Sequence, residues 1–175
     1  EYAYPHERHG SMSTIENHHD RKIVTFSLSG QTFGIDMAAL IEIREWEEPT
    51  PLPTVPAFIK GVTNLRGNVV PVVGLAERLG WAPSQIHARS CVLVVAIGDK
   101  QAGFLVDEVS DIVAIGDSQI QPAPDVDIGE PNIIRGLVRV ASRTKGANDD
   151  EDAGHMVLLL DLDALSLTRH LDQAA

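Results

Sequence analysis

The chain has 175 residues, of which 43% are hydrophobic, enough for one or two packed cores and too apolar for a disordered protein. Its formal net charge of -11 argues against partners that carry many phosphates, either nucleic acid or an anionic membrane surface. The sequence has no apolar run long enough to span a bilayer, and its single cysteine, Cys91, fits a reducing cytoplasm.

Three polar stretches are expected to lie outside the fold. The opening "EYAYPHERHGSM" resembles an expression tag over residues 1–11, and polar sequence continues to about residue 20. Polar composition without periodicity predicts a disordered leader over 1–20 and a long mobile loop within 144–154. Residues 169–175 are interpreted as a tail.

Short strand patterns begin after the leader. "KIVTFSLSGQTFGIDM" predicts two strands joined at Ser29 and Gly30. "AALIEIREW" is apolar and is followed by four closely spaced prolines, which rule out a long helix there. "GVTNLRG" and "NVVPVVGL" predict a hairpin that turns near Arg66, and "LAERLGW" predicts a short helix ended by Gly80.

The second half of the chain repeats the first. At an offset of 69 positions Gly34 falls on Gly103 and Glu42 on Asp111. Further along, "FIKGV" matches "IIRGL", and "VVPVVGL" matches "MVLLLDL". Single matches between apolar strands are weak, but their order is preserved over most of the chain. The sequence therefore predicts a duplicated unit and two similar β-barrels.

The sequence carries no recognisable catalytic motif. It lacks a glycine-rich phosphate loop, paired CxxC cysteines, HExxH and a G-x-S-x-G elbow. Outside the leader, His87, His155 and His170 are isolated, and Cys91 lies in an apolar strand pattern typical of a core. We therefore expect no enzyme activity, no catalytic residue, no metal site and no cofactor.

Arg66 is the one charged residue of an otherwise uncharged stretch, and it has two interpretations. It can extend from the hairpin tip into solvent, or it can pair with a carboxylate of a neighbouring strand. The planar guanidinium suits the second role, because it can hold a carboxylate and fix two segments in register. Glu42 in "LIEIRE" is the candidate partner.

"GVTNLRGNVVPVVGL" resembles the signature of the CheW-like family, the coupling proteins of bacterial chemotaxis. The flanks agree with this resemblance: "ALIEIRE" and "FIKGV" lie upstream, and "GFLVDEVSDIV" and "LLLDLDAL" lie downstream. It extends from about Lys22 to Leu167. One departure is Gly74, where the family often has an aspartate, whereas the second repeat keeps Asp161.

The resemblance implies an all-β fold of two intertwined, five-stranded SH3-like β-barrels with a few short helices. The domain would cover 21–168, with a first barrel over about 31–90. A second barrel would cover about 91–168 and take an exchanged N-terminal strand from about 22–29.

The resemblance also implies a non-catalytic, cytoplasmic adaptor recruited to receptor arrays. It would couple chemoreceptor tips to the regulatory domain of the chemotaxis histidine kinase. The implied receptor-binding residues are Leu40, Glu42, Gly61, Asn64 and Arg66, whereas the kinase-binding residues remain unassigned. Two alternatives stay open: a scaffold of the same fold in another signalling pathway, such as pilus motility or a second-messenger circuit, and a small metal-binding β-barrel protein.

Overall fold

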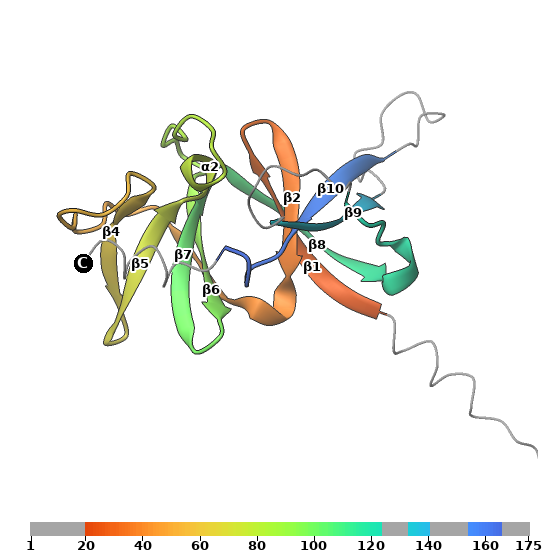
Figure 1. Cartoon of the computed structure of the whole chain (residues 1–175), viewed down its shortest axis with the longest axis horizontal. Coiled ribbons are helices and arrows are strands. Elements are labelled where there is room, and N and C mark those ends of the chain that lie inside the picture. The colour runs from red at the N-terminus through yellow and green to blue at the C-terminus, as the bar shows by residue number, and fades with distance from the viewer. Residues whose placement is uncertain (1–19, 124–132, 141–153, 166–175) are drawn as a thin grey trace, which may run out of the picture.

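The computed structural model describes residues 20–123, 133–140 and 154–165, which form two five-stranded sheets side by side (Figure 1). The predicted leader, most of the predicted loop and the tail lie outside these residues. The first sheet has the strand order β3 (Leu40–Glu45), β6 (Cys91–Ile97), β7 (Lys100–Val106), β5 (Asn68–Gly74), β4 (Ile59–Leu65). The second has the order β8 (Glu108–Gly116), β1 (Asp20–Leu28), β2 (Gln31–Asp36), β10 (His155–Leu160), β9 (Ile134–Val140). The predicted all-β class is confirmed.

Short helices join the strands. The 3-10 turn η1 (Met37–Ala39) leads from β2 to β3, α2 (Leu75–Arg78) follows β5, and η2 (Asp117–Gln119) follows β8. The helix predicted from "LAERLGW" is thus confirmed as the single turn α2.

Two complete hairpins are exchanged between the halves of the chain. β1 and β2 pair with strands of the second half, whereas β6 and β7 lie between β3 and β5 of the first half (Figure 1). The expected barrel limits were therefore wrong for 31–36 and for 91–106. The physical reason is that a two-residue turn joins only antiparallel neighbours. β2 must therefore lie beside β1 in the same sheet, and β7 must lie beside β6.

The two sheets are built to the same plan. Adding five to each strand number, and counting on from β1 after β10, converts the order of the first sheet into that of the second. The edge strands β3 and β8 also carry a register shift at corresponding places. The shift lies between Leu40 and Glu42 in β3, and between Val109 and Asp111 in β8. This correspondence supports the duplication predicted from the sequence.

One short bridge ties the two ends of each sheet together. Beyond β3, Thr50 exchanges two backbone hydrogen bonds with Val62 of β4, with N–O distances of 2.9 and 2.8 Å. Gln121 and Leu137 form the equivalent bridge between the continuation of β8 and β9, at 2.8 Å in both directions. These bridges bend each sheet toward the barrel form that the resemblance implies.

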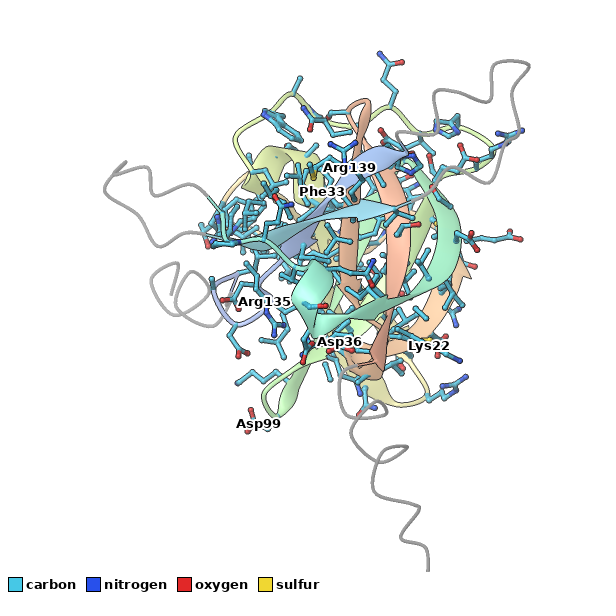
Figure 2. The ribbon with its side chains drawn as sticks, turned by 90° about the vertical axis from the view of Figure 1, so that its right-hand side faces the viewer. Lys22, Phe33, Asp36, Asp99, Arg135 and Arg139 are labelled. Carbon is cyan, nitrogen blue, oxygen red and sulfur yellow. The ribbon has the colours of Figure 1, made fainter. Side chains whose placement is uncertain are left out.

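The main core lies where the exchanged hairpins meet. Phe26 and Phe33 come from β1 and β2, and their rings stack with centroids 6.0 Å apart. Leu93 and Phe104 from β6 and β7 belong to the same buried cluster. Figure 2 looks along the molecule onto the second sheet and shows Phe33 within it, away from Lys22 at the rim. Apolar burial between the hairpins thus joins the two sheets.

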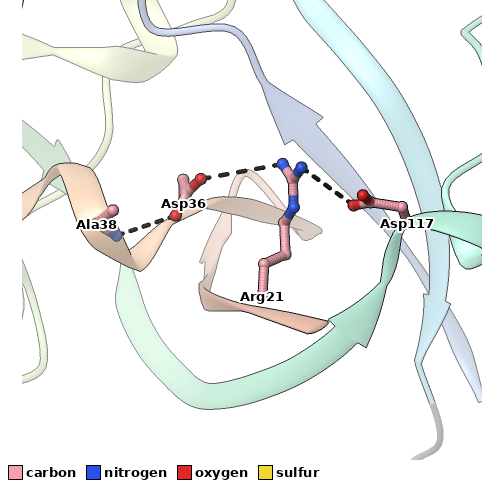
Figure 3. A network of polar contacts seen from close by, with 4 residues as sticks. All are labelled: Arg21, Asp36, Ala38 and Asp117. Carbon is pink, nitrogen blue, oxygen red and sulfur yellow. Dashed lines mark hydrogen bonds and ion pairs between the residues drawn. The ribbon is translucent and has the colours of Figure 1, made fainter. Parts of the chain in front are cut away.

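A charged contact holds the crossover from the second sheet to the first. Arg21 at the start of β1 pairs with Asp117 at 3.0 Å and lies 4.0 Å from Asp36 (Figure 3). Asp36 in turn caps η1, because its Oδ1 accepts a hydrogen bond from the backbone N–H of Ala38 at 3.0 Å. The start of β3 is therefore fixed relative to both η1 and η2.

The first bridge requires a glycine at position 61. Its φ is +145°, and a Cβ there would lie 2.3 Å from the carbonyl oxygen of Thr50. We expect Gly61→Ala to cost about 2–4 kcal/mol of unfolding free energy, from backbone strain together with steric overlap. Urea denaturation measures this loss.

The matched control is Gly67→Ala. Gly67 also has a positive φ, of +88°, but a Cβ there would meet nothing within 4 Å. It should therefore cost only the left-handed backbone penalty of about 1–2 kcal/mol. Equal losses in the two variants would contradict a steric role of Gly61 at the bridge.

Candidate functional site

The β4–β5 hairpin displays Arg66 at its tip. Arg66 has a φ of +54° and Gly67 a φ of +88°, the pair of positive values that a two-residue type I′ turn requires. Asn64 supports the turn, because its Oδ1 accepts a hydrogen bond from the backbone N–H of Gly67 at 2.9 Å. The backbone of N-L-R-G thus fixes the point from which the arginine side chain leaves the sheet.

Glu42 lies on β3, at the opposite end of the same sheet. It is opposite Val94 of β6, and the register shift between Leu40 and Glu42 marks a β-bulge. A bulge bends an edge strand and re-aims the side chains beside it. Because the bridge between Thr50 and Val62 joins the ends of the sheet, the side chain of Glu42 can reach the β4–β5 hairpin.

The predicted contact between Arg66 and Glu42 is confirmed. The Nη1 atom of Arg66 lies 2.8 Å from Oε1 of Glu42. The Arg66 side chain is 75% exposed, whereas that of Glu42 is only 19% exposed. The pair therefore joins a solvent-facing cation to a carboxylate that is anchored at the sheet surface.

The sequence interpretation did not include the second partner of Glu42. Arg44 donates from Nη1 to Oε2 of the same carboxylate at 2.9 Å. The signal was present in "LIEIRE", because residues two apart on a strand point to the same side. Each oxygen of Glu42 thus faces a different guanidinium.

The two arginines favour the charged form of Glu42. The hydrogen bond from Arg44 is the main cause that lowers the pKa of Glu42 below its ordinary value of 4.5, and the charge of Arg66 adds to it. Partial desolvation of the carboxylate opposes this shift but does not reverse it. Glu42 therefore remains ionised at neutral pH and below.

Two of the five predicted receptor-binding residues have structural roles in the first sheet. Leu40 is half-buried and packs against the main core. Gly61 gives the backbone clearance that the bridge to Thr50 needs. Glu42, Asn64 and Arg66 meet at the ion pair and the turn that presents it. The structure thus joins Glu42 and Arg66 by a direct contact, bonds Asn64 to the turn that carries Arg66, and places Leu40 and Gly61 on the same two strands as these residues.

Exposed apolar side chains alternate with Glu42 along β3 and point to the opposite face of this edge strand. Ile41 is 42% exposed and Ile43 is 46% exposed, and they flank Glu42 along β3. Ile43 is opposite Leu93, which is buried in the main core. The sequence interpretation did not single out these two isoleucines, since an apolar residue in a strand is normally expected to face a core. We call Ile41, Glu42, Ile43 and Arg66 the β3 surface.

Little else in the described residues carries reactive chemistry. They contain no group of three or more His, Cys, Asp or Glu side chains arranged to hold a metal ion. Burial raises the pKa of the Cys91 thiol, which disfavours its reactive thiolate form. Within the same residues, no helix is long and apolar enough to cross a membrane.

Comparison with known proteins identifies the family. A family model described as the CheW-like domain matches residues 22–169. The chain belongs to the CheW-like family. It is 36% identical over 150 residues to the probable chemotaxis protein CheW of Rhizobium etli, a match that covers 85% of this chain and 89% of that protein.

Two further comparisons agree. The CheW-like chain is 34% identical over 146 residues to the chemotaxis protein CheW of Rhizobium meliloti, covering 83% of this chain and 86% of that protein. Its fold resembles the crystal structure of the scaffolding protein TtCheW from Thermoanaerobacter tengcongensis, with a TM-score of 0.69 and 29% identity over 83% of this chain and 91% of that one. The family predicted from the sequence is confirmed.

The departure at Gly74 has a local compensation in this CheW-like chain. Gly74 precedes α2 and supplies no side-chain cap, whereas Asp161 accepts hydrogen bonds from the backbone N–H groups of Asp163 and Ala164. A Cβ at Gly74 would lie 2.5 Å from Glu77 Oε1, in space that the Lys60–Glu77 ion pair borders. The first half thus has no capping side chain at this position, and an ion pair between β4 and α2 borders the space that the side chain would need.

The lowered pKa of Glu42 predicts a defined dependence of stability on pH. A carboxyl group with a depressed pKa in the folded state contributes stability above its unfolded pKa, and loses it as pH falls through the folded pKa. We therefore expect Glu42→Gln to be less stable than the wild type at pH 7, and the difference to shrink as the pH falls below 4.5, the ordinary pKa of the group. Urea denaturation at a series of pH values measures both proteins.

Asp99→Asn is the control for the loss of one surface charge, since Asp99 lies exposed at the β6–β7 turn. A difference between wild type and Glu42→Gln that stays constant down to acid pH would contradict the charge-dependent role of Glu42.

Proposed function

We propose that this chain is a non-catalytic adaptor that couples chemoreceptor cytoplasmic tips to the chemotaxis histidine kinase. Membership of the CheW-like family supports the pathway, and its relatives are chemotaxis proteins. A solved relative is described as a scaffolding protein, which supports the adaptor class. The chain acts in the cytoplasm, at receptor arrays, through binding alone.

The observation that carries the receptor-binding role is the β3 surface. It combines an ion pair presented by a tight turn, Arg66 with Glu42, and two exposed isoleucines on the same strand. The tip of a chemoreceptor is a helical hairpin, and a helix binds through an apolar face. Ile41 and Ile43 offer apolar contact on one face of the edge strand β3, while the exposed guanidinium of Arg66 offers a polar contact for acidic groups on the other face.

The high exposure of Arg66 explains how the pair can serve binding without being a major source of stability. Arg66 is mostly solvated, so solvent and salt screen its attraction to Glu42. The contact instead restricts where the guanidinium lies before a partner arrives. Ordering a long side chain in advance lowers the entropy cost of binding.

A pull-down separates the two proposed partners. The purified chain is incubated with a receptor cytoplasmic fragment and, in a second tube, with the kinase regulatory domain. We expect capture of each partner separately. Capture of neither partner would overturn the adaptor function. Capture of the kinase domain alone would overturn the receptor-binding role.

The ion pair should affect receptor binding more than it affects folding. We expect Arg66→Ala to weaken binding of the receptor fragment by about fivefold or more, the effect of losing a contact worth about 1 kcal/mol. Its melting temperature should stay close to that of the wild type, because Arg66 is 75% exposed. Isothermal titration calorimetry and thermal denaturation supply the two measurements.

A double-mutant cycle with Glu42→Gln tests whether the pair itself is the cause. The two single effects on binding should not add in the double variant, since each one removes the same contact. A full charge swap is a weaker test, because Glu42→Arg introduces a second cation beside Arg44. Arg89→Ala, which removes an exposed arginine paired with Glu108, is the control. Normal receptor binding by Arg66→Ala would remove the β3 surface from the proposed site.

A further inference from the structure

We propose that Arg44 is a positioning residue that holds the Glu42 carboxylate in the orientation needed to receive Arg66. This inference rests on the proposed receptor-binding function of the β3 surface. It adds to that surface a residue whose side chain acts through Glu42 rather than by contact with the partner.

The geometry divides the carboxylate between two cations. Arg66 is 2.8 Å from Oε1 and Arg44 is 2.9 Å from Oε2, so the contacts use different oxygens and can exist together. A Glu side chain has three rotatable bonds, and a single contact with a mostly exposed arginine would leave it free to turn. The second hydrogen bond fixes the plane of the carboxylate and leaves Oε1 directed toward the hairpin tip.

The position of Arg44 makes it the better anchor of the two arginines. Its side chain is 40% exposed, against 75% for Arg66, and it lies on the same strand as Glu42. It is opposite Val92, and it lines a small cavity of about 20 Å³ together with Val70 and Val94. This apolar surrounding and its lower exposure leave the Arg44 side chain less freedom than that of Arg66.

The second half of the molecule shows the arrangement without the arginine. At the offset of 69 positions that relates β3 to β8, Asp111 corresponds to Glu42 and Val113 corresponds to Arg44. There one oxygen of the carboxylate, Oδ1 of Asp111, accepts a hydrogen bond from the backbone N–H of Ile112 at 2.8 Å.

Three variants separate the charge of Arg44 from its packing. Arg44→Met keeps an apolar stem over the cavity and removes the charge. Arg44→Lys keeps both the stem and a donor that can reach Glu42. Arg89→Met is the matched control, because it removes an exposed arginine that pairs with Glu108 at 3.2 Å. Each variant is made in the full chain, alone and with Glu42→Gln.

The first measurement needs no partner. Carbon-detected NMR titration of the side-chain carboxyl group reports the pKa of Glu42 in each variant. The hydrogen bond from Arg44 is the leading cause of its lowered pKa, so Arg44→Met should raise it, whereas Arg44→Lys and Arg89→Met should leave it near the wild-type value. A Glu42 pKa unchanged by Arg44→Met would overturn the positioning role, whatever the partner.

The second measurement is affinity for a receptor cytoplasmic fragment. Arg44→Met should weaken binding about threefold to tenfold, and the loss should vanish when Glu42 is already Gln, because the two residues act as one unit. Arg44→Lys should restore binding to within about twofold of the wild type. A loss of the same size in the Glu42→Gln background would mean that Arg44 acts independently of Glu42, and would overturn the inference.

The outcomes distinguish this inference from the proposed function. If Arg66→Ala weakens binding but Arg44→Met does not, the receptor site stands and the positioning role is wrong. If Arg44→Met raises the pKa of Glu42 but the wild-type chain does not bind the receptor fragment, the proposed receptor function is wrong.

Discussion

The turn between β1 and β2 constrains the whole molecule. Ser29 and Gly30 reverse the chain in two residues, with φ values of +52° and +81°, so the two strands must be neighbours in one sheet. Once β1 pairs with β8 of the second half, β2 must lie in that sheet too. The same reasoning moves β6 and β7 into the first sheet. The main core forms between the two exchanged hairpins, and the position of every other strand follows from theirs.

The candidate site uses a feature at each end of the first sheet. Glu42 belongs to its edge strand β3, and Arg66 belongs to the hairpin at the other end. The bridge between Thr50 and Val62 joins these ends, which explains why a residue pair separated in strand order can make a direct contact. The contact between Arg66 and Glu42 thus depends on the bridge between the two ends of the sheet, and that bridge depends on a glycine at position 61.

The sequence predicted the family, the all-β class and the contact between Arg66 and Glu42. Those predictions depended on short-range signals: the N-L-R-G turn, alternating strands and an acidic strand within the same repeat. The exchange of complete hairpins was not predictable from these signals, because an apolar hairpin has the same pattern in either sheet. Arg44 was omitted for a similar reason. Strand alternation places Arg44 on the same side of β3 as Glu42, but it does not show that the guanidinium of Arg44 contacts the carboxylate of Glu42.

Hairpin exchange also sets the order in which the protein can assemble on the ribosome. β1 and β2 leave the ribosome before the other described strands, but their partners β8, β9 and β10 are the last of these strands to be made. Phe26, Leu28 and Phe33 therefore have no native partner sheet while most of the chain is being translated. The first sheet can close earlier, as soon as β7 has emerged, because β3 to β7 supply all of its strands. Until β8 is made, nascent chains thus carry an unpaired apolar hairpin ahead of the first sheet, and exposed apolar surface of this kind promotes aggregation during folding.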